Sequence, residues 1–422
     1  MKEHDFICNN LARQLTVVFA SHTYIGSPFV VGSHHLANQF AKMGHTVFHL
    51  STPISPAHLL KVNGSSCRVR FANWLKGGER RNRVINYVPF TFIPWNIAKY
   101  YHRKNLMYSA CWPPLPRKIK QYGIREIDLL LIDQYSFVGL EELIRPKVSI
   151  YRATDLYSEM GNDQRIDQLE EQLVQRADGI IATSAPVLKQ LRRYNAAKPW
   201  LLLENGVDFA HFYHKSDPPS PLSGLGGPIA IYAGALDDRL DRAALKFLAT
   251  ALPELQLVLI GPCNAKDRGY FQACSNVHLL GQVDYAELPY YLNYATFGLL
   301  PLSDHPANEG RSPMKLYEYA ASGLPVIARH TKELGRREER HVHLYKSLEE
   351  LIGQARQLMK HAGSAALDRE SICQSAHIHS WESKAEQLID FAEGIARNTG
   401  SPDKLLSGSG ALQESLASSS SG

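Results

Sequence analysis

A lysine and a glutamate three residues apart, Lys315 and Glu318, lie in the segment SPMKLYEYAASGLP, which has clear helix boundaries. Ser312 is a favourable N-cap residue, and Pro313 suits the first position of a helix. The sequence therefore predicts a helix that carries Lys315 in its first turn. Unpaired amides and the helix dipole favour anions there, so a bound diphosphate would satisfy the amides and the lysine together.

Glu318 lies on the same face of this predicted helix as Lys315. A carboxylate beside a phosphate site is repelled unless the same ligand donates hydrogen bonds to it, and the two hydroxyls of a ribose are suitable donors. The pair therefore predicts a binding site for a nucleoside diphosphate. An ordinary surface ion pair between residues i and i+3 is the alternative interpretation.

The elements that would position this helix repeat along the chain. Short, continuously apolar runs are typical of parallel strands that are covered on both faces. In the first half such runs begin at Leu15, His45, Ile127, Lys147, Ala177 and Pro199, and in the second half at Pro228, Leu255, Val277, Thr296 and Leu324. Helical patterns alternate with them. The sequence thus predicts an α/β protein with two doubly wound domains, whose ligands bind at the carboxyl ends of the strands in the cleft between them.

The length of 422 residues exceeds what one hydrophobic core usually supports. The Pro/Gly/Ser-rich stretch 215–228 is predicted to link an N-terminal domain, 1–214, to a C-terminal domain, 229–398. The last predicted helix, 381–398, could return to the N-terminal domain. The Ser/Gly-rich remainder, 399–422, is expected to be disordered.

Cysteine usage and hydropathy bound the class of protein. The six cysteines form no CxxC pair, which favours a reducing compartment and argues against a disulfide framework or a zinc site. No apolar run approaches the ~20 residues of a membrane-spanning helix. We therefore expect a cytoplasmic protein.

A basic and aromatic segment, residues 61–125, contains fourteen Lys/Arg and one acidic residue, Glu79, and so carries a charge of +13 in a chain of net charge +5. Eleven aromatic residues are interleaved with these charges. The combination favours adsorption to an anionic membrane surface. A nucleic acid is the rival partner, and a solvated basic face over a partly buried aromatic cluster is the third interpretation.

Several of these motifs resemble those of one family. The run SPMKLYEYAASGLPVIA resembles the donor-binding helix of GT-B glycosyltransferases, and YRATD from Tyr151 resembles the Y-R-A-S-D stretch of the xanthan glucuronosyltransferase GumK. NGVD from Asn205, AGALDDR from Ala233 and GQV from Gly281 follow in the same order. The resemblance implies the GT-B fold, with two Rossmann-like domains that face each other across a cleft, and a nucleoside diphosphate sugar, UDP-linked, as the donor.

The resemblance also implies roles for residues of the second half. Lys315 would bind the donor diphosphate, and Glu318 takes the place of a glutamine in GumK. Further donor-binding positions match Met314, Gln282 and Val283 (the last two at the base) and the loop Gly234, Ala235, Leu236. Arg239 would be a second cation at the diphosphate, or would pair with Asp237 or Asp238. GT-B enzymes of this type need no metal, so we expect no metal and no cofactor besides the donor substrate.

Asp155 is the candidate catalytic residue. It follows the strand-like run KVSIY at its carboxyl end, where a carboxylate could take the proton of an acceptor hydroxyl that attacks the sugar C1. A helix N-cap or loop aspartate is the alternative. The resemblance implies an inverting transferase of polysaccharide biosynthesis, with glucuronic acid as a candidate sugar. The acceptor would be a polyprenyl-diphosphate-linked glycan at the inner face of the membrane, with segment 61–125 holding it and no nucleic acid bound.

Two other functions stay open at this point. A retaining GT-B transferase is favoured by a glutamate at 318, but the position eight residues earlier, an acid in such enzymes, is Gly310, with Glu309 beside it. A non-catalytic protein that binds nucleotide sugars or nucleic acid is the alternative from another class. His34 and His35 either line the acceptor side of the cleft or are polar residues at a helix start.

Overall fold

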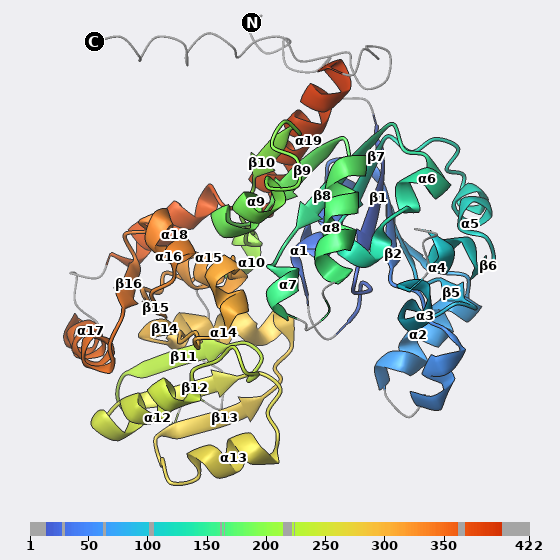
Figure 1. Cartoon of the computed structure of the whole chain (residues 1–422). Coiled ribbons are helices and arrows are strands. Elements are labelled where there is room, and N and C mark those ends of the chain that lie inside the picture. Colours follow the sequence, from blue (N-terminus) through green and yellow to red (C-terminus); the bar gives the residue numbers. More distant parts are fainter. Residues whose placement is uncertain are drawn as a thin grey trace, which may run out of the picture.

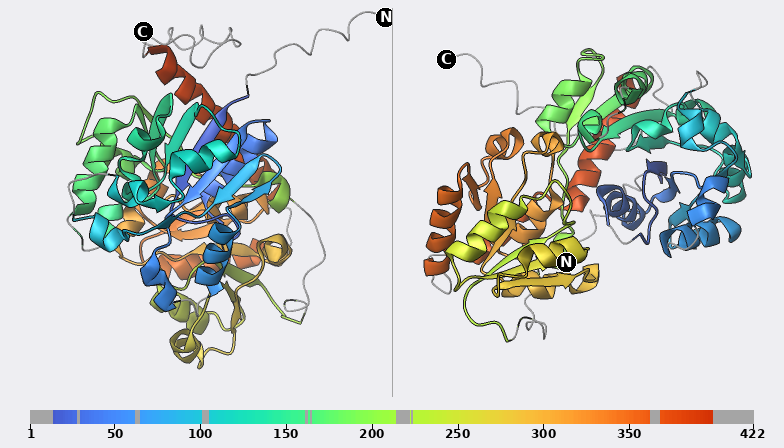
Figure 2. Two further views of the ribbon diagram at one scale, coloured as in Figure 1. Left: turned by 90° about the vertical axis from the view of Figure 1, so that its right-hand side faces the viewer. Right: turned by 60° about the horizontal axis from the view of Figure 1, so that its bottom comes forward.

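The computed structural model describes residues 14–27, 30–61, 65–100, 105–160, 163, 165–213, 222, 224–361 and 368–398. Most of the predicted linker and all of the predicted tail, 399–422, lie outside the described residues. The described chain forms two large sheets that lie side by side, each with helices on both faces (Figure 1, Figure 2).

The first sheet has eight strands in the order β10-β9-β8-β7-β1-β2-β4-β3. All neighbouring strands are parallel except β3 and β4. Their bounds are β1 Thr16–Ser21, β2 Thr46–Ser51, β3 Glu79–Arg81, β4 Val84–Tyr87, β7 Leu129–Ile132, β8 Val148–Ala153, β9 Gly179–Ala182 and β10 Trp200–Leu202. A separate antiparallel pair joins β5 Phe90–Thr91 to β6 Cys111–Trp112.

The second sheet has six parallel strands in the order β13-β12-β11-β14-β15-β16. This order, outward in both directions from the first strand, is that of a doubly wound dinucleotide-binding sheet. The bounds are β11 Ile229–Ala233, β12 Gln256–Ile260, β13 Val277–Gly281, β14 Phe297–Leu300, β15 Val326–Arg329 and β16 Val342–Tyr345. The predicted fold class is confirmed.

Helices cover both faces of each sheet because the buried strands are apolar on both sides. The helices of the first half are α1 Gly32–Lys42, α2 Ser65–Leu75, α3 Trp95–Ala98, α4 Leu106–Ser109, α5 Leu115–Gln121, α6 Leu140–Ile144, α7 Tyr157–Met160, α8 Arg165–Arg176 and α9 Ala185–Leu191. The chain continues with α10 Phe209–Phe212, α12 Arg242–Ala251, α13 Ala265–Phe271, α14 Leu288–Tyr294, α15 Met314–Ala321, α16 Lys332–Arg337, α17 Leu348–His361, α18 Arg369–His377 and α19 Trp381–Asn398.

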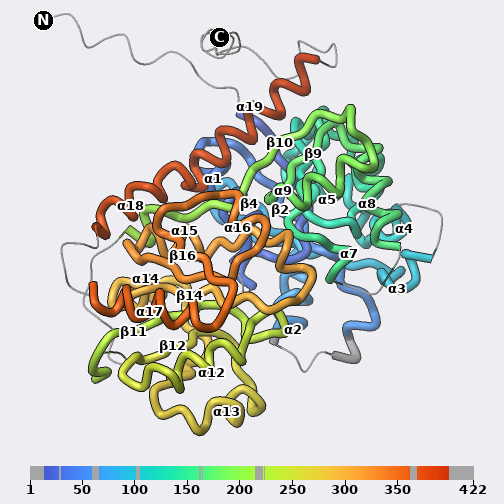
Figure 3. Tube along the Cα trace, turned by 60° about the vertical axis from the view of Figure 1, so that its left-hand side comes forward, coloured from blue at the N-terminus to red at the C-terminus, as the bar shows by residue number. Residues whose placement is uncertain are grey.

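The last helix, α19, crosses from the second half to the first (Figure 3). Its residues Leu388, Ala392 and Ile395 join the core that β1 and α1 form on one face of the first sheet. Helices α5, α6, α8 and α9 cover the opposite face of that sheet. Within the described ranges, no helix is long and apolar enough to cross a membrane.

Strands β3, β4 and β16 were not predicted from the sequence. β4 has four residues and follows the charged run 79–83, so its short apolar pattern does not stand out from its surroundings. It becomes a strand by pairing in parallel with β2, from Val47↔Val84 to Leu50↔Tyr87. Part of the basic segment 61–125, strands β3 and β4, therefore forms one edge of the first sheet.

Candidate active site

Helix α15 begins at Met314, with Pro313 as its N-cap residue. The expectation that Ser312 caps it is wrong. The Ser312 hydroxyl accepts hydrogen bonds from the Asn205 amide nitrogen (3.2 Å) and from the Arg337 guanidinium (2.9 Å). Ser312 thus fixes the start of the helix against the first half of the chain, and the first-turn amides have no side-chain cap.

Lys315 lies in the first turn of α15, and its Nζ is 2.5 Å from Oε2 of Glu318. The Glu318 side chain is only 3% exposed, whereas that of Lys315 is 26% exposed. The pair is therefore not an ordinary surface ion pair. Lys315 lies at a helix N-terminus and is partly exposed to solvent. It can therefore contact an anionic ligand while it stays paired with the buried carboxylate of Glu318.

The loop Gly234, Ala235, Leu236 follows β11 at its carboxyl end. The Tyr232 hydroxyl donates to the carbonyl of Ala235 (2.8 Å), and the Arg242 guanidinium donates to that of Leu236. A Cβ at residue 261 would overlap the carbonyl oxygen of Gly234, so Gly261 is required for this close approach of two strand ends. The loop is held in one conformation before any ligand binds.

The other predicted donor-binding residues lie at the same edge of the second sheet. Gln282 and Val283 follow β13, and Val283 packs partly buried against the core of the second half. Met314 packs against the core of the first half, so the start of α15 touches both halves. The carboxyl ends of β11 and β13 and the start of α15 therefore lie at the edge where a doubly wound sheet binds its ligands.

Asp155 lies two residues beyond β8, at the carboxyl end of that strand. Its carboxylate accepts a hydrogen bond from the Thr154 hydroxyl (3.0 Å). Burial raises the pKa of Asp155, and Thr154, Arg311, Arg239 and His22 act in the opposite direction. Asp155 of the first half therefore interacts with two arginines of the second half, across the junction of the two sheets.

Arg239 forms the ion pair with Asp237 that was one of its two predicted alternatives, with Nη2 and Oδ2 2.5 Å apart. It also interacts with Asp155. Arg311, which sequence analysis missed, lies four residues before Lys315 and interacts with Asp155 and Asp237. Its signal in the sequence is only its place next to the predicted donor helix.

A buried ion pair lies behind this site. Arg152 is 1% exposed, its Nη1 is 3.4 Å from Oδ1 of Asp133, and its Nη2 donates to Asn205 Oδ1 (3.0 Å). Burial raises the pKa of Asp133, and Arg152 offsets part of this increase. Asn205 in turn donates to the carbonyl of Ser312 (2.8 Å). The chain of contacts couples the ends of β7 and β8 to the start of α15.

Two further contacts hold the halves together. The Ser184 hydroxyl donates to the carbonyl of Gly310 (2.7 Å), and the Ala185 amide donates to the Glu333 carboxylate (3.0 Å). Gly310 packs so closely that a Cβ there would lie 2.5 Å from Cγ of Leu156. Gly310, in the segment before α15, therefore packs directly against Leu156, the residue that follows Asp155.

Histidines of the first half line the same region. His34 donates to or accepts from the Thr23 hydroxyl (2.9 Å), and burial lowers its pKa to about 4. The ring of His35 stacks on Trp381 at 5.2 Å, and burial, with smaller effects of His34 and Lys315, lowers its pKa to about 3. Both histidines are therefore neutral at physiological pH and add no charge beside Lys315.

Among the described residues, no group of three or more His, Cys, Asp or Glu side chains is arranged to hold a metal ion. The chain matches two families. Residues 18–183 match the family "Glucuronosyltransferase GumK, N-terminal domain", and residues 239–390 match the family "Glycosyl transferase-like". The first match contains Asp155, and the second contains Lys315 and Glu318.

A relative from Bacillus subtilis (strain 168), described as a teichuronic acid biosynthesis glycosyltransferase, TuaH, is 27% identical over 187 residues. The match covers 43% of this chain and 47% of TuaH, so it spans about half of that relative.

Two solved structures share the fold over most of their length. A sucrose-phosphate synthase from Thermosynechococcus elongatus has a TM-score of 0.68 at 18% identity, with 92% of this chain and 100% of that chain covered. HepE of Anabaena, solved in complex with UDP, has a TM-score of 0.62 at 16% identity, with 90% and 100% covered. The chain therefore has the GT-B fold of glycosyltransferases and resembles GumK.

Proposed function

We propose that this chain is a glycosyltransferase of glycan biosynthesis that uses a nucleoside diphosphate sugar. The observation that carries the proposal is the start of α15, where Lys315 emerges from a buried carboxylate beside uncapped helix amides, while the preceding residues contact Leu156 and interact with Asp155. These groups match the diphosphate that leaves in the reaction. UDP is the proposed nucleotide, and the UDP complex of the similar HepE supports this choice.

In the proposed reaction, the oxygen of an acceptor hydroxyl attacks C1 of the donor sugar, and Asp155 takes the proton of that hydroxyl. The bond between C1 and the diphosphate oxygen breaks, and its electron pair leaves with the nucleotide. Lys315 and the first-turn amides of α15 stabilise the charge that develops on the diphosphate. The raised pKa of Asp155 makes it a stronger base than an ordinary carboxylate.

We propose direct displacement with inversion. The position where retaining enzymes carry their first acid is Gly310, and its close packing against Leu156 leaves no room for a side chain. The neighbouring Glu309 is exposed and accepts a hydrogen bond from the Lys332 amide (3.4 Å). Glu318 is engaged with Lys315.

Glucuronic acid is the proposed donor sugar. Lys315 and the helix amides already suit the diphosphate. Arg239 and Arg311, which both interact with Asp155, provide positive charge in addition to that site. Arginine matches a carboxylate by bidentate hydrogen bonding, so a uronic acid is a suitable partner for this additional charge. The match of residues 18–183 to the GumK family supports the same sugar.

The acceptor is proposed to be a polyprenyl-diphosphate-linked glycan, presented at the inner face of the membrane. Six of the fourteen large apolar side chains that are exposed among the described residues belong to segment 61–125: Val69, Leu75, Phe92, Ile97, Tyr100 and Trp112. Exposed aromatic and apolar side chains beside basic residues favour a lipid surface. Tyr87, Phe90 and Tyr108 are buried, so part of the aromatic set serves the core.

The test is a panel of UDP-, GDP- and ADP-sugars, each measured by thermal shift and by transfer of labelled sugar to lipid extracts. UDP-glucuronic acid is expected to raise the melting temperature most, because a ligand that binds only the folded state stabilises it by mass action. A panel without any shift would contradict the donor site. Binding of arbitrary RNA without sugar turnover would favour the non-catalytic alternative.

A further inference from the structure

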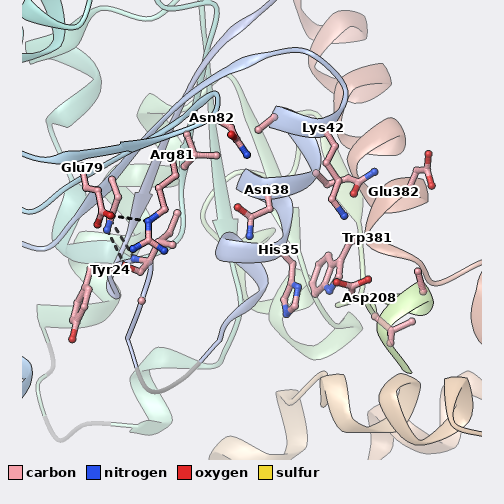
Figure 4. A pocket seen from close by; sticks show the side chains of 18 of the residues that line it. Tyr24, His35, Asn38, Lys42, Glu79, Arg81, Asn82, Asp208, Trp381 and Glu382 are labelled. Atoms are coloured by element: carbon pink, nitrogen blue, oxygen red, sulfur yellow. Dashed lines mark hydrogen bonds and ion pairs between the residues drawn. The ribbon is translucent and has the colours of Figure 1, made fainter. Parts of the chain in front are cut away.

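A cavity of about 940 Å³ lies along α1 in the first half of the chain (Figure 4). Asn38 and Lys42 of α1 line its floor. Arg81 and Asn82 of the β3–β4 hairpin flank one side, and Asp208 and Trp381 flank the other. This groove is larger than a monosaccharide needs and lies within the range of small-molecule sites.

Two lining segments of the groove lie near residues of the candidate active site. His35 lines the groove and interacts with Lys315 of the donor helix. Tyr24 to Gly26 also line it, and they follow His22, which interacts with Asp155. A ligand that fills the groove would thus extend toward the catalytic carboxylate past the loop between β1 and α1.

The walls of the groove are fixed by buried amides. Asn86 of β4 donates to the carbonyl of Ile25 (2.8 Å) and accepts from its amide (3.3 Å). Asn73 of α2 donates to the carbonyl of Asn86 (3.1 Å) and accepts from the amide of Val88 (2.8 Å). The groove is therefore formed before a ligand arrives.

The charges that line the groove are balanced. Three basic side chains face three acidic ones: Lys42, Lys76, Arg81, Glu79, Asp208 and Glu382. Arg81 pairs with Glu79 at 2.7 Å. A balanced lining favours neither a phosphate nor a nucleic acid, both of which need an excess of positive charge.

The polar side chains of the groove also disfavour a hydrocarbon chain, whose burial would desolvate them without compensation. Asn38, Gln39 and Asn82 present amides, each of which both donates and accepts hydrogen bonds. Sugar hydroxyls have the same dual capacity. A neutral polyhydroxyl ligand is thus the class that matches this lining.

We propose that this groove binds the oligosaccharide part of the acceptor, with several sugars along α1 and the accepting end toward Asp155. The inference rests on the proposed function, and it adds a saccharide subsite beside the exposed apolar side chains of segment 61–125, one of which, Val69, also lines the groove. It assigns recognition of glycan length to α1 and the β3–β4 hairpin.

The test is saturation-transfer NMR of the whole chain with cellotetraose, maltotetraose, chitotetraose and mannotetraose, each against its monosaccharide. We expect at least one tetrasaccharide to bind, with loss of its signal in Asn38→Trp, which fills the groove. Gln387→Trp is the matched control, because it places the same ring on an exposed amide position of α19 outside the groove. The thermal shift caused by UDP is measured in parallel with every variant.

The outcomes separate the two proposals. If UDP shifts the melting temperature but no tetrasaccharide binds, or if binding survives in Asn38→Trp, the groove is not the saccharide site. A tetrasaccharide signal that inorganic pyrophosphate or high salt abolishes would reveal an anion site and would equally overturn the inference. Failure of UDP itself to bind would instead contradict the proposed function.

Discussion

The two halves of the molecule treat their buried carboxylates differently. In the second half, Glu318 pairs with Lys315 at 2.5 Å, and Glu333 pairs with Arg336 and Arg337, both at 2.9 Å. In the first half, Glu170 is 1% exposed, and its bonded partner is the neutral hydroxyl of Tyr151 (2.6 Å). The buried glutamates of the second half are thus paired with cations, whereas the first half contains, besides the Arg152–Asp133 ion pair, a buried acid whose bonded partner is neutral.

The same contrast applies to the site. Burial raises the pKa of Asp155, as a general base requires, and raises the pKa of Glu170 to about 7. The groups proposed to hold the diphosphate must instead stay charged throughout the reaction. In the proposed reaction, proton transfer therefore belongs to the first half and stabilisation of the leaving group to the second.

The largest expected effect is on Asp155→Asn. Loss of a general base typically lowers the rate ~10²–10⁴-fold, so transfer should collapse while UDP binding, on the other half, persists. Labelled-sugar transfer and calorimetry measure the two quantities. Glu159→Gln, an exposed acid on α7, is the matched control.

The stereochemistry of the product sharpens this prediction. Inversion predicts the anomeric configuration opposite to that of the donor, which proton NMR couplings report. Retained configuration, or near-normal turnover of Asp155→Asn, would remove Asp155 from the role of base.

Lys315→Ala should weaken UDP binding ~10- to 100-fold, since a hydrogen bond to a charged group contributes about 1.5–3 kcal/mol. Removal of the lysine also leaves Glu318 buried without its cation, so the ligand-free protein should lose stability.

The double variant Lys315→Ala/Glu318→Gln separates these two effects. It should recover most of the lost stability in thermal melts but not the affinity for UDP by calorimetry. Unchanged UDP affinity in both variants would contradict the diphosphate site.

Glu170 should make stability depend on pH in the first half. Its folded pKa, about 7, lies above the ordinary value of 4.5, so the folded state holds a proton that the unfolded state has lost between these values. Stability from this group is complete below pH 4.5 and is lost as pH rises through 7. Glu170→Gln should reduce that dependence.

Thermal melts between pH 5 and 8 measure the effect, which should amount to a few degrees. Glu171→Gln, an exposed neighbour on α8, is the control and should leave the pH profile of wild type unchanged. A wild-type melting temperature that does not fall over this range would show that Glu170 is ionised in the folded protein.

The smallest expected effect concerns the membrane. Phe92→Ser should reduce co-sedimentation with anionic vesicles a few-fold, because Phe92 is 62% exposed within the basic segment. Phe247→Ser makes the same change at an exposed position of α12 in the second half and should have no effect. Binding that shows no preference for anionic over neutral lipid would contradict the proposed surface.

Sequence patterns were sufficient for the repeated strands and helices of both halves. Continuous apolar runs such as β1 and β12 are buried on both faces, so their character does not depend on distant partners. Gly234 and Gly261 directly follow β11 and β12, whose ends approach each other closely. A glycine after an apolar run indicates a turn in the sequence. β4 was missed because its four residues directly follow the charged run 79–83, and its pairing with β2 could not be seen in the sequence.

The sequence by itself determined which residues could do chemistry. Lys315 lies in the first turn of a helix, where a cation is unfavourable without an anion, and Asp155 follows a buried strand. Only the tertiary structure decided their partners. It turned Ser312 from a cap into a contact between the halves, buried Glu318 beneath Lys315, and brought Arg311 of one sheet to Asp155 of the other. Local patterns reflect local backbone preferences and burial, whereas the contacts of Ser312 with Asn205 and of Arg311 with Asp155 join residues more than a hundred positions apart, whose proximity depends on how the two sheets pack.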